Sequence, residues 1–414
     1  MNALITLLGM AVLLGIGFAL SNNRKSIRPR TILGAFAIQF TIGGIVLFVP
    51  LGRQILDTLS RGVQNVINYS DKGISFMFGG LVSDSMHGLF DGFGYVFAFR
   101  VLPIIVFFSS LIAVLYYLGI MQLVIRIIGG ALRAILGTSR TESLSAAANI
   151  FVGQTEAPLV VRPYIAHMTQ SELFAVMCGG LASIAGSVLA GYAQMGVELK
   201  YLLAASFMAA PGGLLFAKLL RPEVDVPDDG VISKIDDPDR PANVFDAAAG
   251  GAARGLKLAA NVGAMLLAFI SLIALVNGMI GGIGGWFGYP DISVQQILGV
   301  VFSPLAWVIG VPWNEALQAG GLLGQKLILN EFVAYADFIQ IKGELSPQAQ
   351  AIITFALCGF ANLSSIAILL GGLGILAPNR RGDIARMGLK AVAAATLSNL
   401  LSAAIAGFFL SFAL

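Results

Sequence analysis

The chain has 414 residues, of which 57% are apolar and only 11% are charged, and its formal net charge at pH 7 is +3. A soluble domain carries roughly 25% charged residues, so this composition excludes an ordinary soluble protein and means that most of the surface faces lipid. The weak net charge offers no basic surface for nucleic acid, and the two cysteines, Cys178 and Cys358, lie in apolar segments where neither a disulfide framework nor a metal site is expected.

Membrane-spanning segments come first in chain order, and each needs about 20 apolar residues. Eight segments qualify: 3–21, 31–50, 100–120, 172–192, 200–220, 247–279, 349–373 and 388–412. The first of them lacks the basic start of a cleavable signal peptide, and basic residues follow it instead, so we expect a spanning helix there. Residues 51–98 mix charged with apolar positions and become rich in glycine, which predicts a surface helix followed by a loop.

The orientation follows from the positions of the 25 Lys and Arg residues. If the basic loop Arg24–Arg30 lies in the cytoplasm, most of the other basic residues also fall on the cytoplasmic side. This holds only if segments 141–168 and 312–346 return to the side from which they enter. The sequence therefore predicts two re-entrant hairpins, and it places both termini on the outer side of the membrane.

A polar linker, residues 221–246, divides the chain into halves. It is rich in aspartate and proline, which favours a solvated cytoplasmic loop. An aspartate-rich metal-diphosphate motif of membrane prenyltransferases is the alternative, but Pro238 interrupts the cluster and Arg240 occupies the position of the last acid.

The two halves repeat the same order of elements: an amphipathic stretch, a broken polar hairpin and two spans. The sequence Met177–Ala185 also resembles Leu357–Ala367. Because the charge distribution makes one hairpin enter from inside and the other from outside, the repeat is inverted and the hairpin tips should meet near the midplane. The predicted fold is all-α and polytopic, with eight transmembrane helices, two opposed re-entrant hairpins in an inverted repeat, and interfacial amphipathic helices.

Polar side chains gather at the breaks of these hairpins. The first hairpin carries Asn149, Gln154, Thr155 and Glu156, and the second carries Glu331. A carboxylate inside a membrane costs about 2.5–3.5 kcal/mol on insertion scales, so such residues indicate function. Carboxylates accept hydroxyl protons and repel anions, which favours a neutral, hydroxyl-rich ligand.

The spans that follow the hairpins add further polar groups. Asn362 and Ser365 are three residues apart, so a helical turn would place them on one face, and Ser183 lies in the corresponding span of the first half. Asn149, Ser183 and carbonyls freed at the break suit a hard cation held by oxygen ligands. Helix packing is the alternative role of Asn362 and Ser365.

Other polar residues have simpler explanations. Helix capping is the expected role of Glu142, Glu172 and Glu315, which lie near the ends of hairpins or spans. We expect His87 and His167 to be surface residues.

Three motifs resemble the bacterial, sodium-coupled concentrative nucleoside transporters, and the similarity extends over essentially the whole chain. The motifs are Gly153–Pro163, Asn330–Tyr335 and Cys358–Ser365. The resemblance implies a homotrimer whose subunits combine a scaffold domain with a moving, elevator-type transport domain. It divides this chain into scaffold helices (1–120), transport repeat 1 (121–220, with hairpin 141–168), the linker (221–246), a scaffold helix (247–290) and transport repeat 2 (291–414, with hairpin 312–346).

The same resemblance assigns roles to residues that match the motifs. It implies contacts to the nucleobase from Gln154, Thr155 and Glu156, contacts to the ribose hydroxyls from Glu331, Asn362 and Ser365, and an apolar wall of Val188, Leu258 and Phe360. It implies sodium ligands in the side chains of Asn149 and Ser183 and the carbonyls of Val152 and Ile184. The expected protein is a symporter, not an enzyme, that imports uridine or a similar nucleoside with sodium and needs no other cofactor. Proton coupling, a channel and an intramembrane enzyme remain as alternatives.

Overall fold

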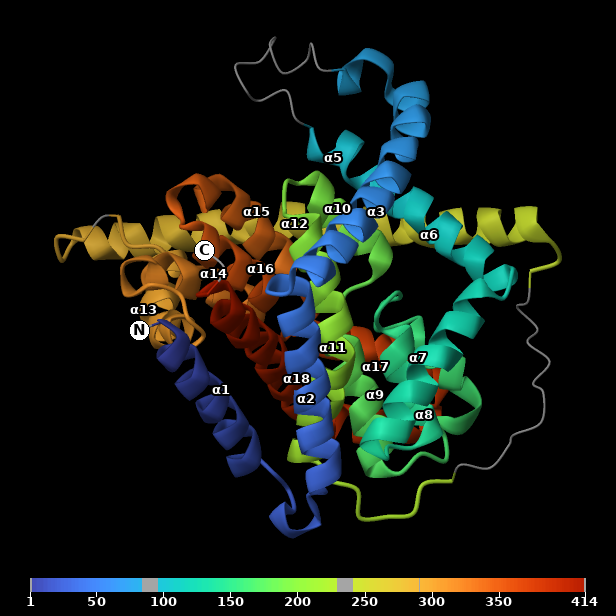
Figure 1. Cartoon of the computed structure of the whole chain (residues 1–414). Helices are drawn as coiled ribbons and strands as arrows, with labels where there is room; N and C mark the ends of the chain where they lie inside the picture. Colours follow the sequence, from blue (N-terminus) through green and yellow to red (C-terminus); the bar gives the residue numbers. More distant parts are fainter. Residues whose placement is uncertain (1, 84–95, 229–240, 290, 413–414) are drawn as a thin grey trace.

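Helices account for every regular element in the part of the chain that the structure describes (Figure 1). The structure is a computed structural model that describes residues 2–83, 96–228, 241–289 and 291–412. Within these ranges there are α-helices and short 3-10 helices and no strand. The predicted helical membrane class is therefore confirmed, whereas His87 and much of the aspartate-rich linker lie outside the described residues.

The first third of the described chain contains three long helices, two short 3-10 helices and one helix in two pieces, α5 and α6. In chain order the elements are α1 (Asn2–Ala19), η1 (Arg24–Ser26), α2 (Pro29–Leu47), α3 (Pro50–Phe78), η2 (Gly79–Val82), α5 (Phe97–Arg100) and α6 (Leu102–Tyr117). The buried residues of α3 include Leu56, Ile67 and Ile74, on one face of a helix whose other face is exposed and charged. This agrees with the surface helix expected after residue 50.

The middle of the chain contains the first predicted hairpin and the spans after it. Its elements are α7 (Ile120–Leu136), α8 (Arg140–Ala148), η3 (Ala157–Tyr164), α9 (Gln170–Ala182), α10 (Gly186–Gln194) and α11 (Leu199–Leu220). Gly137 ends α7 with a φ of 67°, a backbone angle that glycine adopts without strain.

The second half begins with one very long helix, α12 (Val244–Gly285), which crosses the width of the molecule in Figure 1. The later elements are α13 (Val294–Val308), η4 (Trp313–Glu315), α14 (Ala316–Ile328), α15 (Glu331–Ile341), η5 (Lys342–Glu344), α16 (Pro347–Leu357), α17 (Ser365–Leu376), η6 (Pro378–Arg380) and α18 (Arg381–Leu410). Gly310 ends α13 with a φ of 107°, as Gly137 ends α7.

Six stretches of the described chain are long and apolar enough to cross a membrane. They are Pro29–Leu47, Phe97–Tyr117, Gln170–Gln194, Leu199–Leu220, Val244–Gly285 and Pro378–Leu410. Of the eight predicted spans, segment 3–21 forms a shorter apolar helix, segment 172–192 is interrupted between α9 and α10, and segment 349–373 is interrupted between α16 and α17. The number eight and the re-entrant path of the hairpins remain predictions.

The core and the periphery are built from different helices. In the most apolar part of Gln170–Gln194, 94% of the residues are buried, whereas in the most apolar part of Val244–Gly285 only 11% are buried. The buried helices α9, α11 and α18 pack against one another, and α1 and α2 cover them from outside. The outer helices α6 and α12 form a pair, and α12 carries many exposed apolar side chains, as expected for a surface that faces lipid or another subunit.

Several basic segments lie at one end of the molecule. Arg30 Nη2 donates to the carbonyl of Ala134 at 2.6 Å, and the amide of Asn22 donates to the carbonyl of Leu220 at 2.9 Å. The connection between α1 and α2, the end of α7 and the end of α11 are therefore neighbours, and Figure 1 shows both termini away from this end. This arrangement agrees with the charge distribution on which the predicted orientation rests.

Candidate ligand site at two helix breaks

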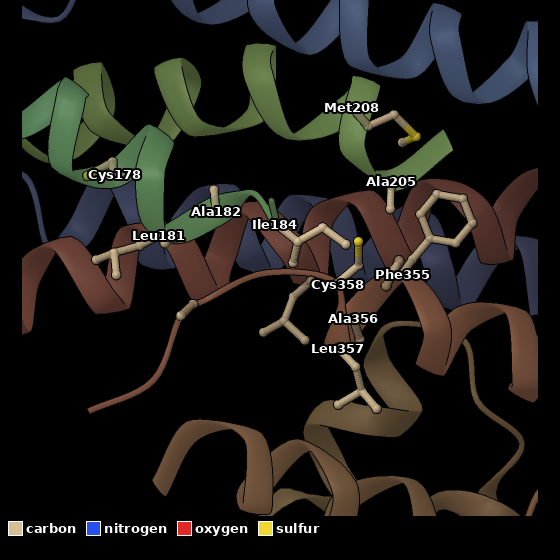
Figure 2. Packing of buried hydrophobic residues seen from close by; sticks show 14 of the residues in the cluster. Cys178, Leu181, Ala182, Ile184, Ala205, Met208, Phe355, Ala356, Leu357 and Cys358 are labelled. Carbon is tan, nitrogen blue, oxygen red and sulfur yellow. The ribbon is translucent and has the colours of Figure 1, made fainter. Parts of the chain in front are cut away.

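Two interrupted helices face each other in the core. The chain leaves helical geometry between α9 and α10, at residues 183–185, and again between α16 and α17, at residues 358–364. The amide of Phe360 donates to the carbonyl of Ser183 at 3.2 Å, which joins the two breaks directly. Figure 2 shows Ile184 of the first break close to Cys358 of the second. Such breaks free backbone groups inside the protein, where a ligand can use them.

The first predicted hairpin places its polar break beside both interruptions. Helix α8 ends at Ala148, and the chain from Asn149 to Glu156 is irregular until η3 begins. The amide of Gly186 donates to the carbonyl of Phe151 at 2.9 Å, and Gln154 Nε2 donates to Ser365 Oγ at 3.4 Å. A Cβ on Gly180 would lie 2.9 Å from Gln154 Cβ, so glycine is needed for this close approach.

The second predicted hairpin brings Glu331 to the same place. Asn330 caps α15 by accepting a hydrogen bond from the amide of Val333 at 2.9 Å, which leaves Glu331 in the first helical turn. A carboxylate is favoured there by the helix dipole. Glu331 is 3% exposed and accepts hydrogen bonds from the Tyr192 hydroxyl at 2.9 Å and from Asn362 Nδ2 at 3.1 Å.

Asn362 and Ser365 lie together, as predicted, although no shared helix produces the arrangement. Helix α17 begins at Ser365, so Asn362 stands before it. The Asn362 carboxamide oxygen accepts from the amide of Ser365 at 2.9 Å and from the Ser364 hydroxyl at 2.7 Å. The Asn362 side chain thus caps α17 with its oxygen and binds Glu331 with its nitrogen, which a simple packing role does not require.

The side chains of the remaining expected ligand residues make no hydrogen bond to those of Glu331, Asn362 or Ser365 within the described chain, and each has other neighbours. Val188 on α10 is buried, while Leu258 on α12 and Phe360 are half-buried parts of the same apolar core. Phe360 lies near Gly153, on which a Cβ would be 3.8 Å from the Phe360 ring. Thr155 is exposed and lies beside Gly372 of α17. Glu156 is half-buried and interacts electrostatically with Arg254 of α12.

The expected sodium ligands come from the start of the first hairpin break and from the break after α9. Asn149 is 1% exposed, and neither polar atom of its amide has a hydrogen-bond partner within the described chain. Ser183 Oγ donates to the carbonyl of Gly179 at 3.0 Å, and Val152 and Ile184 are buried. A buried amide without a partner costs about 1–3 kcal/mol, so Asn149 is suited to a ligand that the protein alone does not supply.

The chemistry of these donors fits a monovalent cation. No group of three His, Cys, Asp or Glu side chains among the described residues could hold a metal ion. The available donors at the break are the amide oxygen of Asn149, the hydroxyl of Ser183 and unwound backbone carbonyls, which is the neutral oxygen environment that transporters offer to Na⁺.

The glutamates outside the cluster act at helix ends. Glu142 and Glu172 each complete a capping box, with Ser139 and Thr169 respectively, which confirms the capping prediction. Glu315 differs in that its carboxylate accepts from the amide and hydroxyl of Ser346 at 3.1 and 3.0 Å, so it holds the start of α16. His167 is exposed, as predicted.

A separate cavity of about 320 Å³ lies at the start of α8, whereas the candidate ligand site lies at the end of that helix. Its lining includes Arg28, Arg133, Glu142, Lys218 and Glu223. Lys218 forms ion pairs with Glu142 and with Glu223 across this region. The lining contains no residue of the polar cluster around Glu331, so the cavity is separate from that cluster.

Tyr192 was not found by sequence reasoning. Its ring is fully buried, and its hydroxyl is one of the two donors that hold Glu331. In the sequence it is a single phenol inside an apolar span, and nothing in its spacing distinguishes it from a core aromatic residue.

Family models match nearly the whole chain. "Na+ dependent nucleoside transporter N-terminus" matches residues 8–81, "Nucleoside recognition" matches residues 98–198, and "Na+ dependent nucleoside transporter C-terminus" matches residues 201–407. The chain is 58% identical to an uncharacterized transporter of Haemophilus influenzae, with 99% of this chain and 98% of the relative covered. It is 52% identical to the nucleoside permease NupC of Helicobacter pylori, again with 99% and 98% covered.

Solved structures also match this chain over its whole length. The structure of CNTnw in an inward-facing substrate-bound state has a TM-score of 0.96 and 62% sequence identity, and the comparison covers 100% of this chain and 99% of that one. A variant of CNTnw in an outward-facing state has a TM-score of 0.98 and 61% identity, with the same coverage.

Proposed function

The chain belongs to the concentrative, Na⁺-dependent nucleoside transporter family, and we propose that it is a symporter that imports nucleosides across the bacterial inner membrane on a sodium gradient. It is a transporter and not an enzyme, because its relatives are permeases. The observation that carries the proposal is the buried cluster in which Gln154 meets Ser365 and Glu331 meets Asn362. It joins both predicted hairpins to the second helix break.

In the proposed complex the nucleoside is bound by two sets of side chains. The ribose hydroxyls donate to Glu331, while Asn362 and Ser365 complete the sugar subsite. Gln154, Thr155 and Glu156 face the base, and Val188, Leu258 and Phe360 form the apolar wall. The support is geometric. Gln154 Nε2 lies 3.4 Å from Ser365 Oγ, and Asn362 binds both the amide of Ser365 and the carboxylate of Glu331. A ligand in contact with Glu331 is therefore within reach of both hairpins.

Sodium would bind at the other side of the first break. Its proposed ligands are the side chains of Asn149 and Ser183 and the carbonyls of Val152 and Ile184. The ion supplies the positive charge that these neutral oxygens are able to hold, and its binding would order the segment between Asn149 and Gln154. An ordered segment presents Gln154 to the nucleoside, which is a physical route for coupling the two ligands.

We further propose that transport uses an elevator motion in a homotrimer. The predicted scaffold (1–120 and 247–290) would stay in place while the predicted transport domain (121–220 and 291–414) moves across the bilayer. Alternating access itself is supported by the similarity to inward-facing and outward-facing structures of CNTnw. The exposed apolar face of α12 is available for lipid and for contacts between subunits.

A cross-link across the proposed boundary tests the motion. A Cβ on Gly17 of α1 would lie 2.6 Å from Leu219 Cδ2 of α11. An oxidised G17C/L219C variant should lose uridine uptake and recover it on reduction. Undiminished uptake by the fully cross-linked protein would exclude movement of α11 relative to α1.

Uptake of radiolabelled uridine into proteoliposomes tests the function. We expect saturable uptake that needs an inward sodium gradient and delivers chemically unchanged uridine. Uptake driven equally well by a proton gradient without sodium would favour the proton-coupled alternative. Uptake that never saturates would indicate a channel, and altered uridine would indicate an enzyme.

A further inference from the structure

We propose that Asn399 of α18 is a positioning residue that couples sodium binding to nucleoside binding, with its carboxamide held in one orientation by the buried Lys326. This inference rests on the proposed function, because it concerns how the two ligands of the symporter affect each other. Neither residue belongs to the ligand sets named above, and both come from helices outside the two breaks.

Asn399 binds both breaks with a single nitrogen atom. Its Nδ2 donates to the carbonyl of Ala182 at 2.7 Å and to the carbonyl of Cys358 at 3.0 Å. Ala182 is the last residue of α9, and Cys358 directly follows α16. One planar amide group therefore fixes the distance between the two points at which the chain stops being helical.

The bonded carbonyls are next to the proposed ligand residues. Ser183 and Ile184, on the sodium side, directly follow Ala182, whereas Phe360 and Asn362, on the nucleoside side, come shortly after Cys358. A displacement of the first break on sodium binding would therefore act on the second break through Asn399. The hydrogen bond from Phe360 to Ser183 links the same two segments at 3.2 Å.

The space around Asn399 leaves no room for another arrangement. The residue is 2% exposed, and a Cβ on Gly359 would lie 2.4 Å from Asn399 Oδ1 and 2.8 Å from the carbonyl oxygen of Ala182. The carboxamide thus lies directly against the backbone of the second break, and glycine at position 359 is what permits it.

Lys326 determines which way the carboxamide points. Its ammonium group donates to Asn399 Oδ1 at 2.7 Å and to the carbonyl of Ala356, in the last turn of α16, at 2.7 Å. A flipped carboxamide would place its NH₂ against the ammonium and its oxygen against two carbonyl oxygens, so the observed orientation is strongly favoured. Lys326 is 3% exposed and lies on α14, five residues before Glu331. The residue that orients Asn399 therefore belongs to the second predicted hairpin.

The test compares N399D with S402A. The carboxylate that N399D introduces would keep the shape and the contact with Lys326 but lose both donations to the carbonyls. Ser402 is also buried on α18, where it accepts a hydrogen bond from Gln39 at 2.8 Å, so S402A removes a buried polar contact of the same helix away from the breaks. For purified full-length protein, calorimetry gives the Kd of uridine in saturating NaCl and in choline chloride, and the ratio of the two measures coupling.

We expect a wild-type ratio of about 5- to 150-fold. In N399D the ratio should fall by about tenfold or to unity, because the carbonyls of Ala182 and Cys358 both lose their donor, while S402A keeps the wild-type ratio. The Kd of sodium with and without uridine should show the same change, because coupling is reciprocal.

The outcomes separate this inference from the proposed function. A wild-type ratio of one contradicts sodium coupling itself. A normal wild-type ratio that N399D retains contradicts the role of Asn399, even if both affinities fall, because a purely structural defect weakens them in parallel. K326M leaves Asn399 in place and removes its orienting donor, so it decides the question if N399D does not yield monodisperse protein: a retained ratio again contradicts the inference, and a reduced one supports it.

Discussion

The substitution Glu331→Gln tests the centre of the proposed sugar subsite. Both carboxylate oxygens of Glu331 accept hydrogen bonds, from the Tyr192 hydroxyl at 2.9 Å and from Asn362 Nδ2 at 3.1 Å. Glutamine has nearly the same shape but only one acceptor oxygen, and its NH₂ group donates. One of the two existing donors would therefore meet another donor, and the negative charge that attracts hydroxyl protons would be lost.

The expected size of the effect follows from the charge. A hydrogen bond to a charged group contributes about 1.5–3 kcal/mol, and each 1.4 kcal/mol changes a dissociation constant tenfold. The Kd of uridine in saturating sodium should therefore rise by about 10- to 150-fold in E331Q. Folding should suffer less, because burial penalises the carboxylate that glutamine replaces.

Calorimetric titration with uridine measures this change, and thermal unfolding checks that the variant is folded. Glu344 offers a matched control in the same hairpin, since it is exposed and accepts a hydrogen bond from Gln318 at 2.9 Å. E344Q should bind uridine like the wild type. A folded E331Q protein with a Kd within about twofold of the wild-type value would refute the assignment, because even a neutral hydrogen bond contributes about 0.5–1.5 kcal/mol.

Three further substitutions test other parts of the structure. N149A should raise the sodium concentration for half-maximal uridine binding by about tenfold without lowering the sodium-free melting temperature, since this amide has no protein partner to lose. Y192F should weaken uridine binding by about 2- to 10-fold, less than E331Q, because it removes one of two donors to Glu331. K218M leaves buried Glu142 unpaired and should lower stability by about 3–5 kcal/mol in unfolding experiments, with recovery in K218M/E142Q. An unchanged sodium dependence, an unchanged uridine Kd or an unchanged stability, respectively, would contradict each assignment.

The polar breaks were predictable because they violate the rules of a membrane interior. A run such as Gln154–Glu156 in apolar sequence has no packing explanation, and Glu331 repeats the signal in the other half. The family followed from the same motifs. The capping glutamates were predictable as well, since Glu142 and Glu172 each stand three residues after a Ser or Thr.

The connections between these segments were not predictable from one sequence. Tyr192, Lys326 and Asn399 are single polar residues in apolar helices, and their partners are 139, 73 and 217 positions away in the chain. Helical periodicity describes one helix at a time and contains no information about which distant carbonyl a side chain will meet. The interruptions of segments 172–192 and 349–373 were missed for a related reason, since each break is short and lies between two apolar stretches.

The polar groups of the proposed nucleoside site already bind one another, and this has an energetic consequence. Glu331 is held by Tyr192 and Asn362, and Ser365 by Gln154. A nucleoside would exchange these bonds for its own, so each contact contributes only the net difference between the two, which is largest at the charged Glu331. The cation side differs, because the amide of Asn149 has no partner to give up. Sodium bound to this amide would hold the segment from Asn149 to Gln154 in the arrangement in which Gln154 meets Ser365, and the affinity for the nucleoside would then depend on the ion having bound.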